Sequence, residues 1–184
     1  SVSRLAEAGL SIVVGTTGWY EHLDEVRSWV RAKNVGLVYG SNFSIGANIV
    51  LRLVAETARL LKDFPEYDAY VLEHHHRGKT DTPSGTALSL ASAILESGKR
   101  KERIEAGRLE AAIEPSALHV VGIRAGSAFG RHVVGFDGPA DAIEISHTAK
   151  SREGFARGAL FAAEWIRGKK GTFEFQELFE GRLT

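Results

Sequence analysis

The chain has 184 residues, and its 23 Lys and Arg side chains balance 23 Asp and Glu side chains. With no net charge, no overall field favours nucleic acid or an anionic membrane as a partner. The chain contains no cysteine, which excludes a disulfide and a thiolate site and suits a cytoplasmic protein, and no apolar run reaches the roughly 18 residues that a membrane-spanning helix needs.

Helices and strands alternate in the first third of the chain, as hydrophobic periodicity indicates. The predicted elements are a helix over 3–9, a strand over 10–14, a helix over 21–33, a strand over 35–39 and a long helix over 44–62. Short links in this order are typical of a doubly wound parallel sheet. Because a helix that feeds a strand usually has a strand before it, we expect the protein to begin before Ser1.

Beyond Pro65 the pattern changes. The predicted elements are a strand over 67–74, a helix over 84–97, a polar surface helix or loop over 97–114, strands over 118–124, 131–136 and 142–148, and a helix over 155–166 followed by a tail. Three consecutive strands with short turns predict antiparallel pairing between sequence neighbours. This part therefore belongs to the α+β class.

These patterns predict an α/β plus α+β protein with two domains. Residues 1–43 and 151–184 form the remainder of a partial Rossmann-like dinucleotide-binding domain. Residues 44–150 form an inserted α+β domain for substrate binding and oligomerisation, built on a mixed or antiparallel sheet.

Two short segments of small and polar residues follow the first two predicted strands. Gly15, Thr16 and Thr17 precede Gly18 after the first strand, and Gly40, Ser41, Asn42 and Phe43 follow the second. Ligands of open α/β sheets bind at such strand ends. A tight turn chosen for its geometry alone explains either segment separately, but their repetition favours a binding site. The fingerprint G-x-G-x-x-G is absent from this chain.

The densest group of reactive side chains runs from Glu73 to Thr86. His75 titrates near neutrality and Lys79 carries a fixed positive charge, so together they can hold an anion and deliver a proton. The Pro-Ser-Gly-Thr sequence begins the next helix, whose first amides, at Gly85 and Thr86, suit a carboxylate or phosphate. If the strand extends this far, His74 and His76 lie on one face and Glu73 and His75 on the other.

Simpler interpretations compete with this one. Three adjacent histidines splay apart on a strand and lack a second ligand cluster, so we expect no metal; a solvated polar loop is the other alternative. Weaker candidates are Arg124 and His132 on the later strands, for which a structural role is at least as good, and His147, Lys150 and Arg152 before the last helix.

The segment Glu73–Ala87 resembles the signature of the 4-hydroxy-tetrahydrodipicolinate reductase family, the dihydrodipicolinate reductases of lysine and diaminopimelate biosynthesis. The family pattern is E-x-H-H-x-x-K-x-D-x-P-S-G-T-A, and every fixed position is met. The turns after the first two strands also look like those of the family, and so do Phe136-Asp137-Gly138 and His147-Thr148-Ala149. The resemblance covers essentially the whole chain.

The resemblance implies NADH- or NADPH-dependent reduction of a small dicarboxylate, the dehydrated form of 4-hydroxy-tetrahydrodipicolinate, to tetrahydrodipicolinate. It implies that His75 is the proton donor and acceptor and Lys79 a second proton donor. His76 and the amides of Gly85 and Thr86 would hold the substrate carboxylates. The cofactor would be lined by Gly15, Thr16, Thr17, Gly40, Ser41, Asn42 and Phe43. The resemblance also implies a homotetramer.

The chain departs from the family at its beginning. The family's first strand, its glycine-rich phosphate loop and the residue that reads the ribose are missing here, so the choice between NAD and NADP is open. Two other functions stay possible from the residues: a non-catalytic dicarboxylate-binding fragment, and another two-domain NAD(P)-dependent dehydrogenase.

Overall fold

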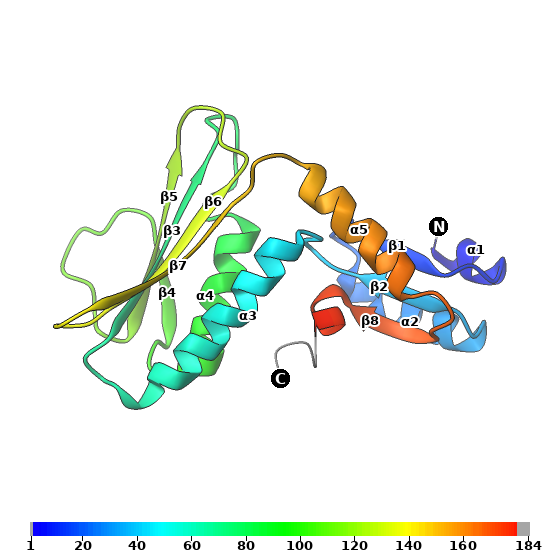
Figure 1. Ribbon diagram of the computed structural model, residues 1–184, viewed down its shortest axis with the longest axis horizontal. Helices are drawn as coiled ribbons and strands as arrows, with labels where there is room; N and C mark the ends of the chain where they lie inside the picture. The colour runs from blue at the N-terminus through cyan, green and yellow to red at the C-terminus, as the bar shows by residue number, and fades with distance from the viewer. Residues whose placement is uncertain (1, 180–184) are drawn as a thin grey trace. The chain divides into compact units, whose positions relative to one another are not determined.

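The computed structural model describes residues 2–179 (Figure 1). The chain forms two compact units. The first unit contains the described residues up to Asn48 and those from Glu153 on, and the second runs from Ile49 to Arg152. Each unit has its own β-sheet.

The first unit is built on a three-stranded parallel sheet in the order β1-β2-β8. Its elements are α1 (Val2–Glu7), β1 (Ile12–Val14), η1 (Tyr20–His22), α2 (Leu23–Ala32), β2 (Gly36–Tyr39), the start of α3 (Ile45–Leu60), α5 (Glu153–Trp165), β8 (Gly171–Glu174) and η3 (Phe175–Phe179). The alternation of β2 buries Leu37 in a cluster with α1 and α2, and Val38 in a second cluster with α5 and η3. Both faces of the sheet are therefore covered.

The second unit is built on a five-stranded mixed sheet in the order β4-β5-β3-β6-β7. Its elements are the rest of α3, η2 (Leu61–Asp63), β3 (Asp68–His75), α4 (Gly85–Gly98), β4 (Arg103–Ala106), β5 (Ala117–Arg124), β6 (Arg131–Asp137) and β7 (Ala142–Thr148). The strand β3 pairs in parallel with β5 and antiparallel with β6. It is thus the central strand, and it carries the Glu-His-His part of the sequence motif.

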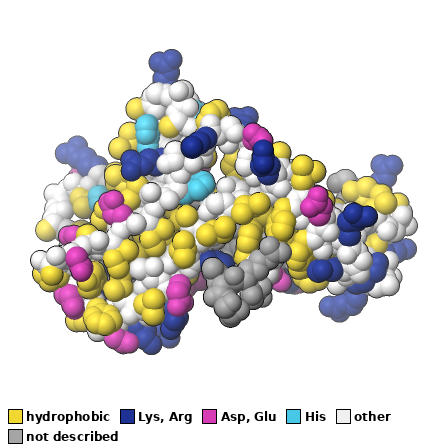
Figure 2. All heavy atoms as spheres, in the orientation of Figure 1, with side chains coloured by type: hydrophobic (Ala, Val, Ile, Leu, Met, Phe, Trp, Pro, Cys, Tyr) yellow, Lys and Arg dark blue, Asp and Glu magenta, His cyan; other side chains and the backbone are white. Residues whose placement is uncertain are grey.

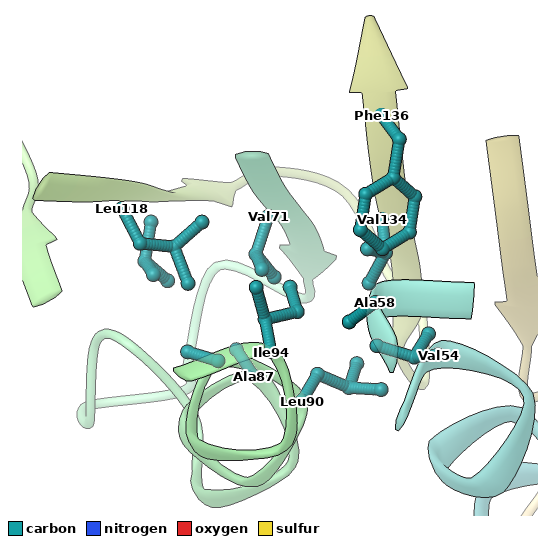
Figure 3. Close-up of a cluster of buried hydrophobic side chains, with 11 residues drawn as sticks. Val54, Ala58, Val71, Ala87, Leu90, Ile94, Leu118, Val134 and Phe136 are labelled. Carbon is teal, nitrogen blue, oxygen red and sulfur yellow. The ribbon is translucent and has the colours of Figure 1, made fainter. Parts of the chain in front are cut away.

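The core of the second unit lies between one face of its sheet and the helices α3 and α4 (Figure 3). Val71 of β3 is fully buried, and it packs in the same cluster as Leu90 and Ile94 of α4 and Val54 of α3. The two helices approach closely, because a Cβ on Gly98 would lie 3.6 Å from the Cβ of Ala58. This packing fixes α4 against the inner face of β3.

Most predicted elements match the structure within a few residues, but three expectations were wrong. Residues 103–106 form the parallel edge strand β4, although 97–114 was predicted as a surface helix or loop. Residues 171–174 of the expected tail form β8. The strands β5 and β6 are not paired with each other, because β3 lies between them; only β6 and β7 form the expected antiparallel pair. Among the described residues, no helix is both long and apolar enough to cross a membrane.

Candidate active site

The last residues of β3 alternate between the two faces of the central sheet. Glu73 and His75 lie on the inner face, with exposures of 0% and 7%, two and four positions after the buried Val71. His74 lies on the outer face, where its Nε2 is 3.0 Å from the carbonyl oxygen of Ala125. The strand ends at His75, so His76 begins the following turn. The predicted alternation is therefore confirmed as far as the strand extends.

Glu73 is the centre of a buried polar cluster. Its Oε1 accepts hydrogen bonds from the backbone amide of Ser84 at 2.9 Å and from Nη2 of Arg124 at 2.6 Å. Its Oε2 lies 3.2 Å from Nδ1 of His75 and 3.6 Å from Nε2 of His132. One carboxylate thus contacts the turn after β3 and the neighbouring strands β5 and β6.

Glu73 is ionised in this setting. Burial by itself raises the pKa of the Glu73 carboxyl, but the polar contacts with His132, Ser84 and Arg124 outweigh burial and hold that pKa well below its usual range. A buried carboxylate with a guanidinium and an amide on one oxygen is a paired charge, and such pairs are costly to break.

His75 is neutral in the ligand-free protein. Burial lowers the pKa of the His75 imidazole to about 4, against the opposing effect of Glu73 and with further lowering by His132, Lys79 and Arg124. A Cβ on Gly130 would lie 2.9 Å from Nε2 of His75. The glycine therefore provides the space for the imidazole edge that is farthest from Glu73.

The sheet register explains why these side chains meet. Gly122 on β5 and His132 on β6 both pair with Glu73, and Arg124 pairs with His75. A Cβ on Gly122 would lie 2.9 Å from Oε1 of Glu73, so the missing side chain leaves room for the carboxylate. His147 on β7 pairs with His132 and extends the row; burial lowers the pKa of its imidazole.

Reasoning from the sequence did not single out Glu73 as a site residue, and it assigned Arg124 and His132 low weight. One signal was available for Glu73: a charged residue at an inward position of a strand, in step with Val71, requires buried partners. Two of these partners, Arg124 and His132, lie more than 50 residues farther along the chain, so the sequence did not show that they meet Glu73. Lys150 and Arg152 are exposed beyond β7.

The turn after β3 presents His76 and Lys79 next to this cluster. The amide of His76 donates to the carbonyl of Ala128 at 2.8 Å, and the amide of Lys79 donates to the carbonyl of His76 at 3.1 Å. The ammonium group of Lys79 contacts both carboxylate oxygens of Asp81, at 2.7 and 2.9 Å. Figure 2 shows histidine and basic side chains together over the loops that follow β3 and β5.

The amino terminus of α4 lies beside Glu73. Ser84 is the N-cap residue, and its Oγ accepts a hydrogen bond from the amide of Ala87 at 3.2 Å. The same Oγ is 3.2 Å from Nε2 of His132. A Cβ on Gly85 would meet no atom within 4 Å, so the space beside this residue is open. First-turn amides of a 14-residue helix favour an anion there.

Glu73, His75 and His132 also have ligand atoms within 4.8 Å of one another, a spacing that a metal ion could use. The guanidinium of Arg124 already lies 2.6 Å from this carboxylate, and a divalent cation would have to sit beside that positive charge. The arrangement fits proton transfer better than metal binding.

In the first unit, the two segments predicted to bind the cofactor lie at the same edge of the sheet. Gly15–Thr17 follow β1 and Gly40–Phe43 follow β2, and the amide of Gly40 donates to the carbonyl of Val14 at 3.2 Å. A Cβ on Gly15 would lie 3.5 Å from the ring of Phe43. The side chain of Asn42 accepts from the amide of Ser44 at 2.8 Å. The parallel strands thus bring together two turns that are 25 residues apart.

Comparison with known proteins gives consistent matches. The model of the family described as "Dihydrodipicolinate reductase, C-terminus" matches residues 46–179. A 4-hydroxy-tetrahydrodipicolinate reductase from Christiangramia forsetii is 36% identical over 97% of this chain and 73% of that protein. The enzyme of the same name from Archaeoglobus fulgidus is 41% identical over 95% of this chain and 68% of that protein.

A solved structure supports the fold. The dipicolinate-bound dihydrodipicolinate reductase from Paenisporosarcina sp. TG-14 superposes with a TM-score of 0.73 at 23% identity, covering 95% of this chain and 69% of that one. The chain spans between 61% and 73% of the length of the curated relatives it matches.

Proposed function

The chain belongs to the dihydrodipicolinate reductase family, and we propose that it provides the substrate site of an enzyme that reduces the dehydrated form of 4-hydroxy-tetrahydrodipicolinate with NADH or NADPH. The product is tetrahydrodipicolinate, in lysine and diaminopimelate biosynthesis. The observation that carries the proposal is the buried Glu73–His75 pair beside the open amino terminus of α4. In this arrangement a proton-transfer group lies next to an anion site within the second unit.

The carboxylates of the substrate are held by positive and dipolar groups of the second unit. The amides of Gly85 and Thr86 at the start of α4 bind one carboxylate, because the helix dipole and the first-turn amides favour an anion. His76 in the turn after β3 binds the other. A dicarboxylate, such as the dipicolinate bound to the related reductase from Paenisporosarcina, is the ligand class that suits two such positions.

His75 acquires its proton when the substrate binds. It is neutral in the ligand-free protein, where burial lowers its pKa to about 4. A dianionic ligand near its imidazole favours the charged form and raises this pKa. His75 then donates a proton to the substrate that has accepted the hydride, and Lys79 donates a second proton at another atom after exchanging Asp81 for the substrate as its ion-pair partner. One proton is returned to His75 as the reduced enamine becomes the imine product, so the reaction adds one hydride and one proton in total.

The cofactor binds to the first unit, at Gly15, Thr16 and Thr17 and at Gly40, Ser41, Asn42 and Phe43, and supplies the hydride. The support is the position of both turns at the carboxyl edge of a parallel sheet. We also propose that this unit is part of a Rossmann-like domain interrupted by the second unit, and that the protein is cytoplasmic.

We propose that the protein assembles as a homotetramer through the outer face of the five-stranded sheet. The helices α3 and α4 pack on the inner face (Figure 1). The outer face carries Ile123, which is 46% exposed. Sedimentation of the full-length protein and of Ile123→Lys measures this directly; a tetramer that Ile123→Lys leaves intact contradicts the use of this face.

The test of the function is NADPH oxidation by the full-length protein, with substrate freshly generated by the preceding synthase. His75→Ala and Lys79→Ala each reduce kcat by roughly 100-fold or more, the usual contribution of a general acid. The matched control is His74→Ala, because this adjacent histidine lies on the opposite face of β3. Full activity in His75→Ala refutes the site assignment. Dicarboxylate binding without turnover in the unaltered protein refutes the catalytic function.

A further inference from the structure

The two carboxylate oxygens of Glu73 have different surroundings: one accepts two hydrogen bonds, and the other faces two imidazoles. Oε1 accepts hydrogen bonds from the amide of Ser84 and from the guanidinium of Arg124. Oε2 has no hydrogen bond of regular geometry among the described residues, and neither does Nδ1 of His75. The two atoms nevertheless lie 3.2 Å apart, so a small rotation of the imidazole joins them.

Leaving both atoms without a partner is unfavourable, because a buried donor or acceptor that loses its hydrogen bond keeps the full cost of desolvation. A hydrogen on Nδ1 satisfies both atoms at once. Hydrogen bonds of catalytic groups are often long or poorly aligned before the substrate binds and tighten in the complex. The geometry therefore selects the imidazole tautomer that carries its hydrogen on Nδ1.

We infer that Glu73 is the positioning residue of His75: it holds the hydrogen on Nδ1 and thereby leaves Nε2 to exchange the proton with the substrate. This inference rests on the proposed function. During turnover the bond between Nε2 and its proton breaks, the proton bonds to the substrate that has accepted a hydride from the cofactor, and the electron pair stays on Nε2. A proton then returns to Nε2, and Glu73 remains ionised throughout.

The groups around His75 support this division of roles. Arg124 on β5 holds Glu73 in its ionised form, so the shared hydrogen stays on the imidazole. His132 on β6 lies with its ring centroid 5.1 Å from that of His75, and Lys79 comes from the turn after β3. Arg124, His132 and Lys79 oppose protonation of His75, and Glu73 is the group that favours it.

The carboxylate of Glu73 also contacts the amino terminus of α4, where the substrate carboxylate is proposed to bind. Oε1 accepts the amide of Ser84, and Ser84 caps the helix whose first amides hold the substrate carboxylate. Glu73 thus fixes the proton-transfer group and the anion site relative to each other. Its removal is expected to affect the rate far more than the affinity, because Ser84 retains its hydrogen bond to Ala87.

The experiment compares Glu73→Gln and Glu73→Asp in the full-length enzyme. Gln keeps an acceptor for Ser84 and Arg124 but presents an amide donor to His75, which reverses the tautomer. We expect kcat to fall by roughly 100-fold with both KM values within about threefold, and the pH limb that reports His75 to move to lower pH. Compared with Glu73→Gln, Glu73→Asp should have a higher kcat and a smaller shift of the pH limb. The control is Glu105→Gln, a half-buried carboxylate on β4.

A measurement on the unaltered protein tests the inference even where a variant does not fold. The ¹⁵N shifts of His75 at pH 7 should show hydrogen on Nδ1 before and after addition of dipicolinate. Hydrogen on Nε2 in the ligand-free protein, or a Glu73→Gln enzyme with unchanged kcat and pH profile, overturns the inference. If His75→Ala is inactive at the same time, the proposed function stands and only the role of Glu73 is lost.

Discussion

Oε2 of Glu73 and Nδ1 of His75 face each other at 3.2 Å on the inner face of β3, at the end of a buried row that includes Val71. The pair lies between the hydrophobic core of the second unit and the turn after β3 that carries His76 and Lys79. The packing of α4 on β3 that buries the core also removes these two side chains from water. Stability and protonation are therefore coupled in this protein.

The first prediction concerns the folding stability of the protein at acidic pH. The unfolded chain binds a proton at His75 near pH 6.5, whereas in the folded state burial lowers this pKa to about 4. Folding stability is thus lost as the pH falls from 6.5 towards 4, and Glu73, whose pKa is also lowered, adds a further loss below about pH 4.5. Between pH 7.5 and 5, the unaltered protein should lose about 2 kcal/mol more than His75→Gln in urea unfolding. An equal loss contradicts the buried neutral His75.

The second prediction concerns Gly130. Its φ of +151° and the 2.9 Å from its ideal Cβ to Nε2 of His75 mean that an alanine displaces the imidazole. We expect Gly130→Ala to reduce kcat at least about tenfold, since misplacement by about 1 Å is costly in catalysis.

Gly126 is the matched control for this change. It lies in the same loop with φ +59°, and its Cβ would meet no atom within 4 Å. Gly126→Ala should cost about 1 kcal/mol of stability from backbone strain and leave kcat unchanged. Equal rates in the two variants would show that Gly130 does not position His75.

The third prediction concerns the cap of α4. Ser84→Ala removes the hydrogen bond to the amide of Ala87 and the contact with His132. The loss of a Ser N-cap costs about 1 kcal/mol, and the loosened first turn should raise the KM of the dicarboxylate several-fold with a smaller change in kcat. Ser89→Ala, whose hydroxyl donates to the carbonyl of Gly85, should leave KM unaltered. Steady-state kinetics and thermal unfolding of both variants check this, and an unchanged KM in Ser84→Ala contradicts it.

The fourth prediction concerns the first unit. A Cβ on Gly158 of α5 would lie 1.6 Å from the carbonyl oxygen of Phe43, so Gly158→Ala forces the turn after β2 out of place. Overpacking of this severity costs about 3 kcal/mol, and the affinity for NADPH should fall with it.

Gly154, one turn earlier on α5, is the control. Its Cβ would lie 3.9 Å from Oγ of Ser44, which is ordinary contact. Gly154→Ala should keep both stability and affinity, as measured by urea unfolding and calorimetry of the full-length protein. Undiminished NADPH affinity in a folded Gly158→Ala protein argues against a role of this turn in cofactor binding.

The sequence by itself determined the local structure and the location of the reactive segment. Hydrophobic periodicity identified most helices and strands, because apolar side chains repeat with the geometry of the element that buries them. The motif from Glu73 to Thr86 identified the reactive segment, since many of the residues that meet there are close along the chain. The short strands β4 and β8 were not predicted, because four residues carry too little hydrophobic periodicity and both ends of β4 are exposed.

Only the tertiary structure decided the order of the strands and the partners of Glu73. Strand order depends on which surfaces pack, and the insertion of β3 between β5 and β6 leaves no trace in the turns that the sequence shows. This order brings Arg124 and His132 to the same carboxylate from opposite sides. Burial, together with the contacts of these two side chains, then sets the pKa of Glu73 and of His75. Burial and contact distance are properties of the folded chain alone.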